Sequence, residues 1–495
     1  MDTLPVIVLQ QVVDQLHIMD ACSFILSTKR LYQHRVSIAR PSDPCTCGCV
    51  ITPTDLNKIS VFHRCNQQNI WLKQKDEGQP YLLETRGEES RAMFEQPFDQ
   101  PLSSVTFPSN VVGVHFNVSL DKQFRIPIEP GDIPDTVTSM TLGRFIQPLK
   151  PGAIPNSVTS LNLALSYTHD LQPGIIPASV KELHYYNSQH PKPGALPPSI
   201  TKLDFGGCKY QLPPGALPPA LTSLNLYNYI GTLALDVLPT SLTHLELGYS
   251  FNQVIELGVL PPRLASLIFG ESFDRPLQPF VLPESLTLLK FVRFDNPLPP
   301  GTLPSSLLSL DMGIYYNIPL EIGSLPASLK SLVLSRSYNQ ELMPRVLPDS
   351  LTHLSFGVGY KKRLTRGLLP ASLTSLGYVN PNLLEFSSHV TFEQCHIRHI
   401  TLDVDSKMHQ PRMPLNSQFD NRVQTLELLH CGNHSINNLI RLFKETDITD
   451  MIIHGHGDNQ VDGDRGEDAK ISVRPLDHKL ILICTNNSKL YISLL

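Results

Sequence analysis

The sequence lacks any apolar run that approaches the roughly 18 uninterrupted residues of a membrane-spanning helix. It also lacks the basic region that opens a secretory signal, because the chain begins Met1-Asp2-Thr3 and Asp14 and Asp20 follow soon after. We therefore expect a cytoplasmic protein with no membrane partner.

Positive charge and cysteine are equally sparse. The 40 Lys and Arg residues are outnumbered by 45 Asp and Glu, for a formal net charge of −5, so we expect no nucleic-acid partner. The nine cysteines are odd in number and thinly spread after Cys65, which is typical of reduced thiols and not of a disulfide framework.

Motifs of catalysis are missing as well. The sequence contains no Gly-x-x-x-x-Gly-Lys phosphate loop, no His-Glu-x-x-His zinc motif and no kinase signature set. We therefore expect neither enzyme activity nor a cofactor.

Two segments collect metal-ligand residue types without the spacing that a metal site needs. Cys45, Cys47 and Cys49 alternate with other residues, with Cys65 downstream, whereas the cysteine pairs of structural zinc sites are usually two to four residues apart. The acidic stretch 454–468 lacks the ligand order and final Glu of an EF-hand. Free thiols and a solvated loop are the plainer interpretations, although the sequence alone leaves open whether these cysteines bind metal.

Proline is abundant, with 43 residues, and it is regularly spaced. A proline stands before a hydrophobic-x-x-hydrophobic-x-hydrophobic run at thirteen places, and after the first interval the spacing is 20 to 22 residues. The positions are Pro108, Pro134, Pro155, Pro177, Pro197, Pro218, Pro239, Pro261, Pro283, Pro304, Pro326, Pro348 and Pro370. A constant period of this length indicates a solenoid of stacked coils.

The chemistry of one repeat predicts its conformation. In Leu242-Thr243-His244-Leu245-Glu246-Leu247, apolar and polar residues alternate as on a strand with one buried face. The period leaves room for a short strand and a return rich in Pro and Gly, but not for a full helix. Stacking would bury about five apolar side chains per coil, each stabilising by roughly 1.5–3 kcal/mol.

The returns carry a recurring aromatic-Asn/Asp signature. Examples are Phe273-Asp274-Arg275-Pro276-Leu277, Phe294-Asp295-Asn296-Pro297-Leu298 and Tyr316-Asn317-Ile318-Pro319-Leu320. Over roughly residues 95–380 this resembles the FNIP repeat, a relative of the leucine-rich repeat found in social amoebae and giant viruses. We expect the aromatic ring to pack inside the coil and the Asn or Asp to satisfy backbone groups of the turn. Residues 166–170 and 228–233 depart from the motif, so different packing is expected there.

Beyond Pro370 the strand signature recurs at about 25 residues. It is found at Ile397 to Leu402, Val423 to Leu428 and Ile448 to Ile453, with a helical pattern from Ile436 to Phe443. We expect longer, partly helical repeats, followed over residues 470–495 by short strands that close the array.

The N-terminal segment differs in kind. Leu9, Val12 and Leu16 share the apolar face of a predicted helix that follows Leu4-Pro5. Together with Ser27 to Tyr32 this order resembles an F-box, which implies docking on the adaptor subunit of an SCF-type ubiquitin ligase. The adaptor-binding residues would be Leu4, Pro5, Leu9, Val12 and Leu16. The sequence departs from the F-box pattern at Val6 and Tyr32, and Pro41 and Pro44 occupy the place of a third helix, so the alternative is a helical cap on the solenoid.

One residue of each strand is predicted to point outward between the last two core positions. This column is chemically mixed, as expected of a binding surface, while the position two residues earlier is mostly Ser. The candidate contact residues are His184, Asp204, Asn225, Glu246, Ile268, Lys290 and Asp311. From Asp204 onward the column holds three acids and one Lys, which indicates a basic partner, although a plain solvated strand surface would fit as well.

The sequence therefore predicts a mostly β, α/β solenoid, a leucine-rich-repeat-like curved array with a parallel sheet on its concave face and a small helical N-terminal segment. The predicted domains are residues 1–40 (F-box-like), 41–94 (linker and cap), 95–380 (repeats of about 22 residues) and 381–495 (longer repeats and C-terminal cap). We expect a protein-binding receptor, an F-box-like substrate-recognition subunit, with a scaffold unrelated to ubiquitin as the alternative.

Overall fold

The computed structural model describes most of the repeat array and the strands that follow it. The described residues are 72–75, 81–86, 89–94, 100–116, 124–143, 145–163, 167, 169–186, 191–192, 194–207, 211–362, 364, 367–379, 397–403, 424–431, 450–455, 470–475, 480–485 and 490–494. The chain divides into two compact units, Asn69–Leu351 and Met1–Gln68 with Thr352–Leu495.

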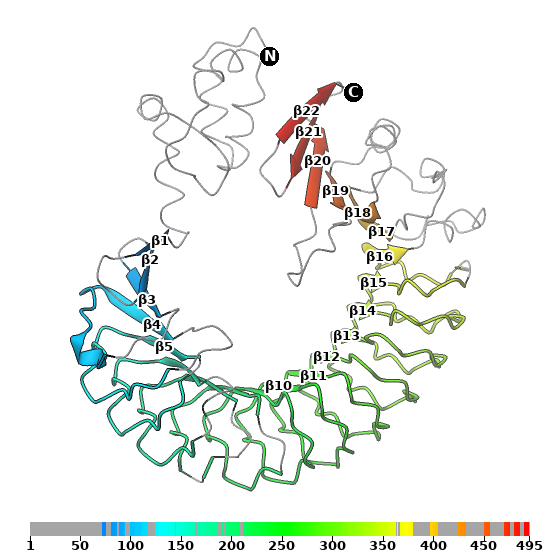
Figure 1. The fold of residues 1–495 in the computed structure, drawn as a ribbon. Coiled ribbons are helices and arrows are strands. Elements are labelled where there is room, and N and C mark those ends of the chain that lie inside the picture. The colour runs from blue at the N-terminus through cyan, green and yellow to red at the C-terminus, as the bar shows by residue number, and fades with distance from the viewer. Residues whose placement is uncertain are drawn as a thin grey trace. The chain divides into compact units, whose positions relative to one another are not determined.

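The unit Asn69–Leu351 is built from short strands joined by irregular returns (Figure 1). Its elements are β1 (Leu72–Lys75), β2 (Leu82–Arg86), β3 (Glu89–Phe94), the 3-10 helix η1 (Leu102–Ser104), β4 (Val111–Phe116), β5 (Ser139–Leu142), β6 (Ser160–Leu163), β7 (Glu182–Tyr185), β8 (Lys202–Phe205), β9 (Ser223–Asn225), β10 (His244–Leu247), β11 (Ser266–Phe269), β12 (Leu288–Lys290), β13 (Ser309–Asp311) and β14 (Ser331–Val333).

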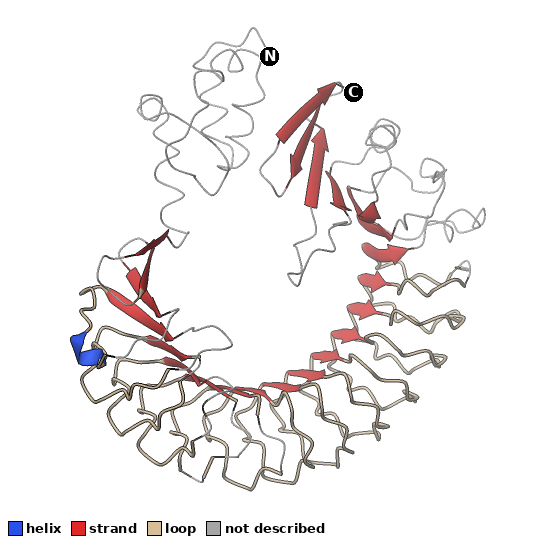
Figure 2. Cartoon of the chain, in the orientation of Figure 1, coloured by secondary structure: helices blue, strands red, loops and turns tan. Residues whose placement is uncertain are grey.

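The sheet of this unit begins antiparallel and becomes parallel. β1, β2 and β3 pair antiparallel, and from β3 to β14 each strand pairs in parallel with the next strand along the chain. Within the unit the array curves, with the strands on its inner side and the returns on its outer side (Figure 2). The predicted parallel solenoid is therefore confirmed, while the predicted N-terminal helices lie outside the described residues.

The second unit contains the last two strands of the regular repeats and the strands that follow them. They are β15 (His353–Ser355), β16 (Ser375–Val379), β17 (His399–Asp403), β18 (Thr425–Cys431), β19 (Asp450–Gly455), β20 (Lys470–Pro475), β21 (Leu480–Thr485) and β22 (Leu490–Leu494). β15 to β19 pair in parallel, and β19 to β22 pair antiparallel. The strands predicted at this end are present, and the predicted helix over residues 436–443 lies outside the described residues.

Each strand buries alternate residues, as the apolar pattern predicts. In β10, Leu245 and Leu247 are 1% and 0% exposed, whereas His244 and Glu246 face outward. Leu242, on the approach to the strand, is fully buried as well. The repeat core is therefore a column of leucines with one row from each coil.

A second column, of aromatic rings, runs beside the leucines. Neighbouring rings lie 6.0 to 6.3 Å apart between centroids and within 14° of parallel. The rings are Tyr229, Phe251, Phe273, Phe294, Tyr316 and Tyr338, all buried. At residues 228–233, where the motif is weak, Tyr229 continues the ring stack, and its hydroxyl donates to the carbonyl of Thr232 at 2.8 Å, a bond that the Phe coils do not make.

In the five coils from Asn252 to Asn339, the Asn or Asp after the ring links one coil to the next. Its side-chain oxygen accepts the backbone N–H of the corresponding residue one coil later, at 2.9 to 3.1 Å. The chain of bonds runs through Asn252, Asp274, Asp295, Asn317 and Asn339. The predicted role in satisfying backbone groups is confirmed, and the donors belong to the neighbouring coil.

A serine before each of eight strands forms a second series of bonds between coils. Its hydroxyl donates to a backbone carbonyl of the preceding coil at 2.6 to 3.1 Å. The donors are Ser157, Ser179, Ser199, Ser241, Ser285, Ser306, Ser328 and Ser350.

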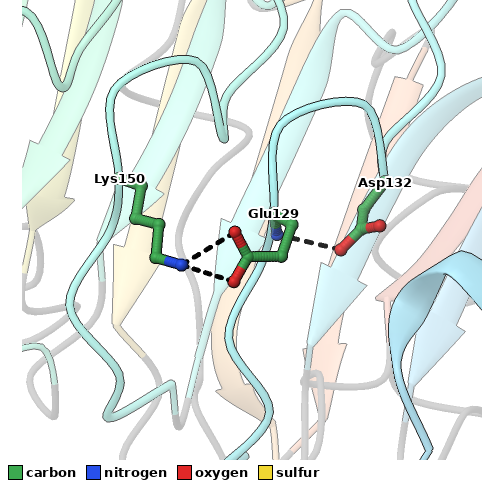
Figure 3. Close-up of polar contacts among 3 residues, drawn as sticks. All are labelled: Glu129, Asp132 and Lys150. Carbon is green, nitrogen blue, oxygen red and sulfur yellow. Dashed lines mark hydrogen bonds and ion pairs between the residues drawn. The ribbon is translucent and has the colours of Figure 1, made fainter.

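Each return ends in a tight turn before the next buried segment. The N–H of its fourth residue bonds the carbonyl of its first, and its third residue has a positive φ, which favours glycine there. Figure 3 shows one such turn, in which Asp132 accepts the N–H of Glu129 at 2.9 Å. Lys150 of the next turn binds both oxygens of Glu129, at 2.6 and 2.8 Å.

Leu245→Asp should destabilise the protein by at least about 3 kcal/mol, because it places a charge in the leucine column. Glu246→Ala, one residue on, should change stability by less than about 0.5 kcal/mol. Chemical unfolding followed by circular dichroism measures both, and a large loss for Glu246→Ala would contradict the assignment of faces.

Candidate functional site

The outward-facing column forms one continuous row across seven neighbouring strands. The strand pairings place its members directly beside one another, from β7 to β13. They are the residues singled out in the sequence: His184, Asp204, Asn225, Glu246, Ile268, Lys290 and Asp311. We call this row the sheet face; its role in binding stays a prediction.

At one end of the sheet face, a histidine is held by a carboxylate. Nδ1 of His184 lies 2.6 Å from a carboxylate oxygen of Asp204, and Nε2 lies 3.9 Å from Glu182. The hydrogen bond that Nδ1 of His184 donates to Asp204 raises the pKa of His184, and partial burial opposes it. This end of the row therefore carries a charge-assisted pair that favours the imidazolium form.

An aromatic ring covers the strand beside this pair. A β-carbon added to Gly206 would lie 2.0 Å from the ring of Tyr186, so only glycine leaves room for the ring there. Burial, and the charge of Asp204 in second place, raise the pKa of the Tyr186 hydroxyl. Tyr186 therefore places an aromatic ring near Asp204 at this end of the sheet face.

In the middle of the row, polar groups lack protein partners. Glu246 forms no ion pair with any described residue, and burial together with the charge of Asp204 raises its pKa, while Lys290 lowers it. The side-chain oxygen of Asn225, between Asp204 and Glu246, is buried without a hydrogen-bond partner among the described residues. Buried or half-buried acceptors of this kind favour a donor brought by a partner.

The other end of the row is internally satisfied. Lys290 Nζ lies 3.3 Å from Asp311, whose other oxygen accepts the N–H of Gly313 at 2.9 Å. Ile268 separates this pair from Glu246. Along the row, the acidic residues Asp204 and Glu246 are therefore followed by the apolar Ile268 and then by the ion pair of Lys290 and Asp311.

The sequence reasoning missed a set of exposed aromatic side chains beyond the strand ends. Tyr227, Tyr249 and Tyr315 are about half exposed, and the guanidinium of Arg293 lies 5.4 Å from the ring centroid of Tyr315. We call these residues the sheet rim. Tyr and Arg dominate binding hot spots in protein interfaces. The sequence signal for them is the two or three variable residues between the last buried residue of the strand and the buried ring.

Several other predicted site residues lie outside the described residues. These are Leu4, Pro5, Leu9, Val12 and Leu16 of the F-box-like segment, and Cys45, Cys47, Cys49 and Cys65. Most of the acidic stretch 454–468 also lies outside them. Among the described residues, no group of three His, Cys, Asp or Glu side chains is placed to hold a metal ion. Nor is any described helix long and apolar enough to cross a membrane.

Comparison with known proteins identifies the repeats. A family model described as FNIP Repeat matches about half of the chain, at residues 126–166, 167–208, 211–250, 251–292, 294–337 and 338–377. Each match spans about two coils, so the family unit is a pair of the structural repeats. No curated protein matches the chain.

Nineteen chains of solved structures also match this chain. Among them is the crystal structure of CroV588, described as a novel circular LRR protein, with 27% identity and a TM-score of 0.54. The match covers 68% of this chain and 52% of that one, so this chain matches about half the length of CroV588. The likeness supports a leucine-rich-repeat type of solenoid.

The raised pKa of His184 predicts a pH dependence of stability. Its pair with Asp204 should contribute about 1 kcal/mol or less, fully below the ordinary histidine pKa of 6.5, and the contribution should fade as the pH rises through the raised value. Thermal unfolding of the wild type and Asp204→Asn should therefore differ most near pH 6 and converge near pH 9. A difference that grows toward alkaline pH would contradict the pairing.

Proposed function

The chain belongs to the FNIP repeat family, and from this premise we propose that it is a protein-interaction receptor whose sheet face and sheet rim bind a partner protein. The observation that carries the proposal is the row of mixed side chains from His184 to Asp311 over an otherwise uniform framework. Repeats that vary only on one exposed column concentrate their specificity there.

The chemistry of the row supports a basic partner segment. Glu246 and Asn225 offer acceptors that have no donor among the described residues, while Asp204 adds a second carboxylate beside them. A Lys or Arg of the partner would satisfy these acceptors, and the half-exposed Tyr227 would stack against its side chain. The pair of Lys290 and Asp311 would mark the far limit of this basic contact.

The N-terminal segment supports a more specific role, on sequence grounds. The resemblance of residues 4–32 to an F-box favours a substrate-recognition subunit of an SCF-type ubiquitin ligase in the cytoplasm. In this proposal Leu4, Pro5, Leu9, Val12 and Leu16 contact the adaptor, and the solenoid presents the target. The chain itself is not an enzyme, and the transfer chemistry belongs to the other subunits.

Charge reversal on the sheet face tests the binding surface. Partners enriched on the purified wild-type protein would be produced separately and titrated against Asp204→Lys and Glu246→Lys, each of which we expect to weaken binding at least tenfold. Asp349→Lys, the same change at an exposed turn, is the control. Equal binding by all three variants would place the interface elsewhere.

A pull-down tests the link to ubiquitin. Full-length protein should retain the SCF adaptor subunit, and a version without residues 1–40 should not, while both keep the same thermal unfolding transition. If folded full-length protein fails to retain the adaptor, the first helices only cap the array and the chain is a scaffold unrelated to ubiquitin.

A further inference from the structure

The returns of six successive coils carry an apolar ridge on the outer side of the solenoid, away from the sheet face. Its exposed side chains belong to the second and third residues of the tight turns, so they protrude furthest from the coil. We call it the turn ridge; its residue pairs are Leu235–Asp236, Leu257–Gly258, Pro279–Phe280, Pro300–Gly301, Ile322–Gly323 and Pro344–Arg345.

The turn ridge is unusually exposed for apolar surface. Phe280 is 77% exposed, Leu257 67%, Ile322 63% and Leu235 60%. Neighbouring turns lie close together, because a β-carbon added to Gly258 would lie 3.7 Å from Leu235 and one added to Gly323 would lie 3.8 Å from Pro300. A contiguous exposed apolar strip on a folded protein marks an interaction surface.

Backbone conformation gives an independent reason to assign a function to the ridge. Among the described residues, the non-glycine residues with positive φ are Asp236 (62°), Phe280 (67°) and Arg345 (69°). All three occupy the third turn position, where most of the other turns have glycine. A bulky aromatic side chain in this conformation is strained, and strain of this kind is found at functional sites.

The order of residues along the ridge is self-complementary. Two copies of the ridge placed antiparallel, with the two-fold axis between Phe280 and Gly301, set each Phe280 against the open surface of a Gly301. The same register sets Leu257 against Ile322. It also sets Asp236 of each copy against Arg345 of the other, and neither of these residues has an ion-pair partner among the described residues.

We propose that the turn ridge is a homodimer interface, at which two copies of this chain pair antiparallel about a two-fold axis between Phe280 and Gly301. Such an interface is isologous, so each unlike contact occurs twice. The three non-glycine residues with positive φ then have one shared explanation, because one supplies the apolar anchor and the other two supply the opposite charges at its ends.

The pairing also contains one unfavourable contact. It places Glu256 of one copy opposite Glu321 of the other, each the first residue of its turn. Repulsion between these like charges limits the strength of the dimer. We therefore expect a dimer that dissociates on dilution. Turns nearer the N-terminus suit such pairing less, because their charged side chains already have partners within the same chain. Lys150 binds Glu129, and Lys192 lies 3.8 Å from Asp170.

Analytical ultracentrifugation of the full-length chain over a range of concentrations tests the proposal. The wild type should show a reversible monomer–dimer equilibrium. Phe280→Gly should raise the dissociation constant at least tenfold while its melting temperature stays equal or rises, because glycine relieves the strained turn. A wild type that is monomeric at all concentrations, or a dimer unaffected by Phe280→Gly, would overturn the proposal.

A charge swap tests the register. Asp236→Arg and Arg345→Asp should each weaken the dimer, and the double variant Asp236→Arg/Arg345→Asp should restore it. Glu256→Gln should tighten it, and Arg263→Asp, an exposed charge reversal outside the ridge, should leave it unchanged. Failure of the double variant to restore the dimer would overturn the antiparallel pairing.

Discussion

Aromatic rings in successive coils stack 6.0 to 6.3 Å apart, whereas hydrogen-bonded strands lie about 4.8 Å apart. Each coil of the unit Asn69–Leu351 is therefore wider on its ring side than on its sheet side, and stacked wedges must curve. The curvature places the sheet on the inner side of the array, as Figure 1 shows for this unit. The exposed row therefore lies on an inward-curved surface, and the turn ridge lies away from it.

Much of this architecture could be predicted from the sequence, because its determinants are local and periodic. Proline spacing fixed the repeat length, and the alternation around Leu245 fixed which side chains are buried. The bonds of the Asn and Asp ladder could not be predicted in the same way, since the acceptor in Asn317 and the donor in Asn339 belong to different coils. Their pairing depends on stacking geometry, which no single repeat contains.

The candidate site shows the same division. Because the repeats keep a constant register, the row from His184 to Asp311 could be aligned from the sequence alone. The sequence could not separate the satisfied pairs from the unpaired Glu246, because that depends on side-chain conformation. It also missed Tyr227, which follows the strand at the point where the two-residue alternation ends.

The serine and Asn/Asp bonds all join one coil to its immediate neighbour, and the bonds of each series join corresponding groups. Removal of one whole coil would therefore bring two former second neighbours together with matching donors and acceptors, and duplication of a coil would do the same. Gene rearrangements in steps of one repeat can thus lengthen or shorten the array without repair of its core. Evolution can change the reach of such a protein independently of the chemistry displayed on any single strand.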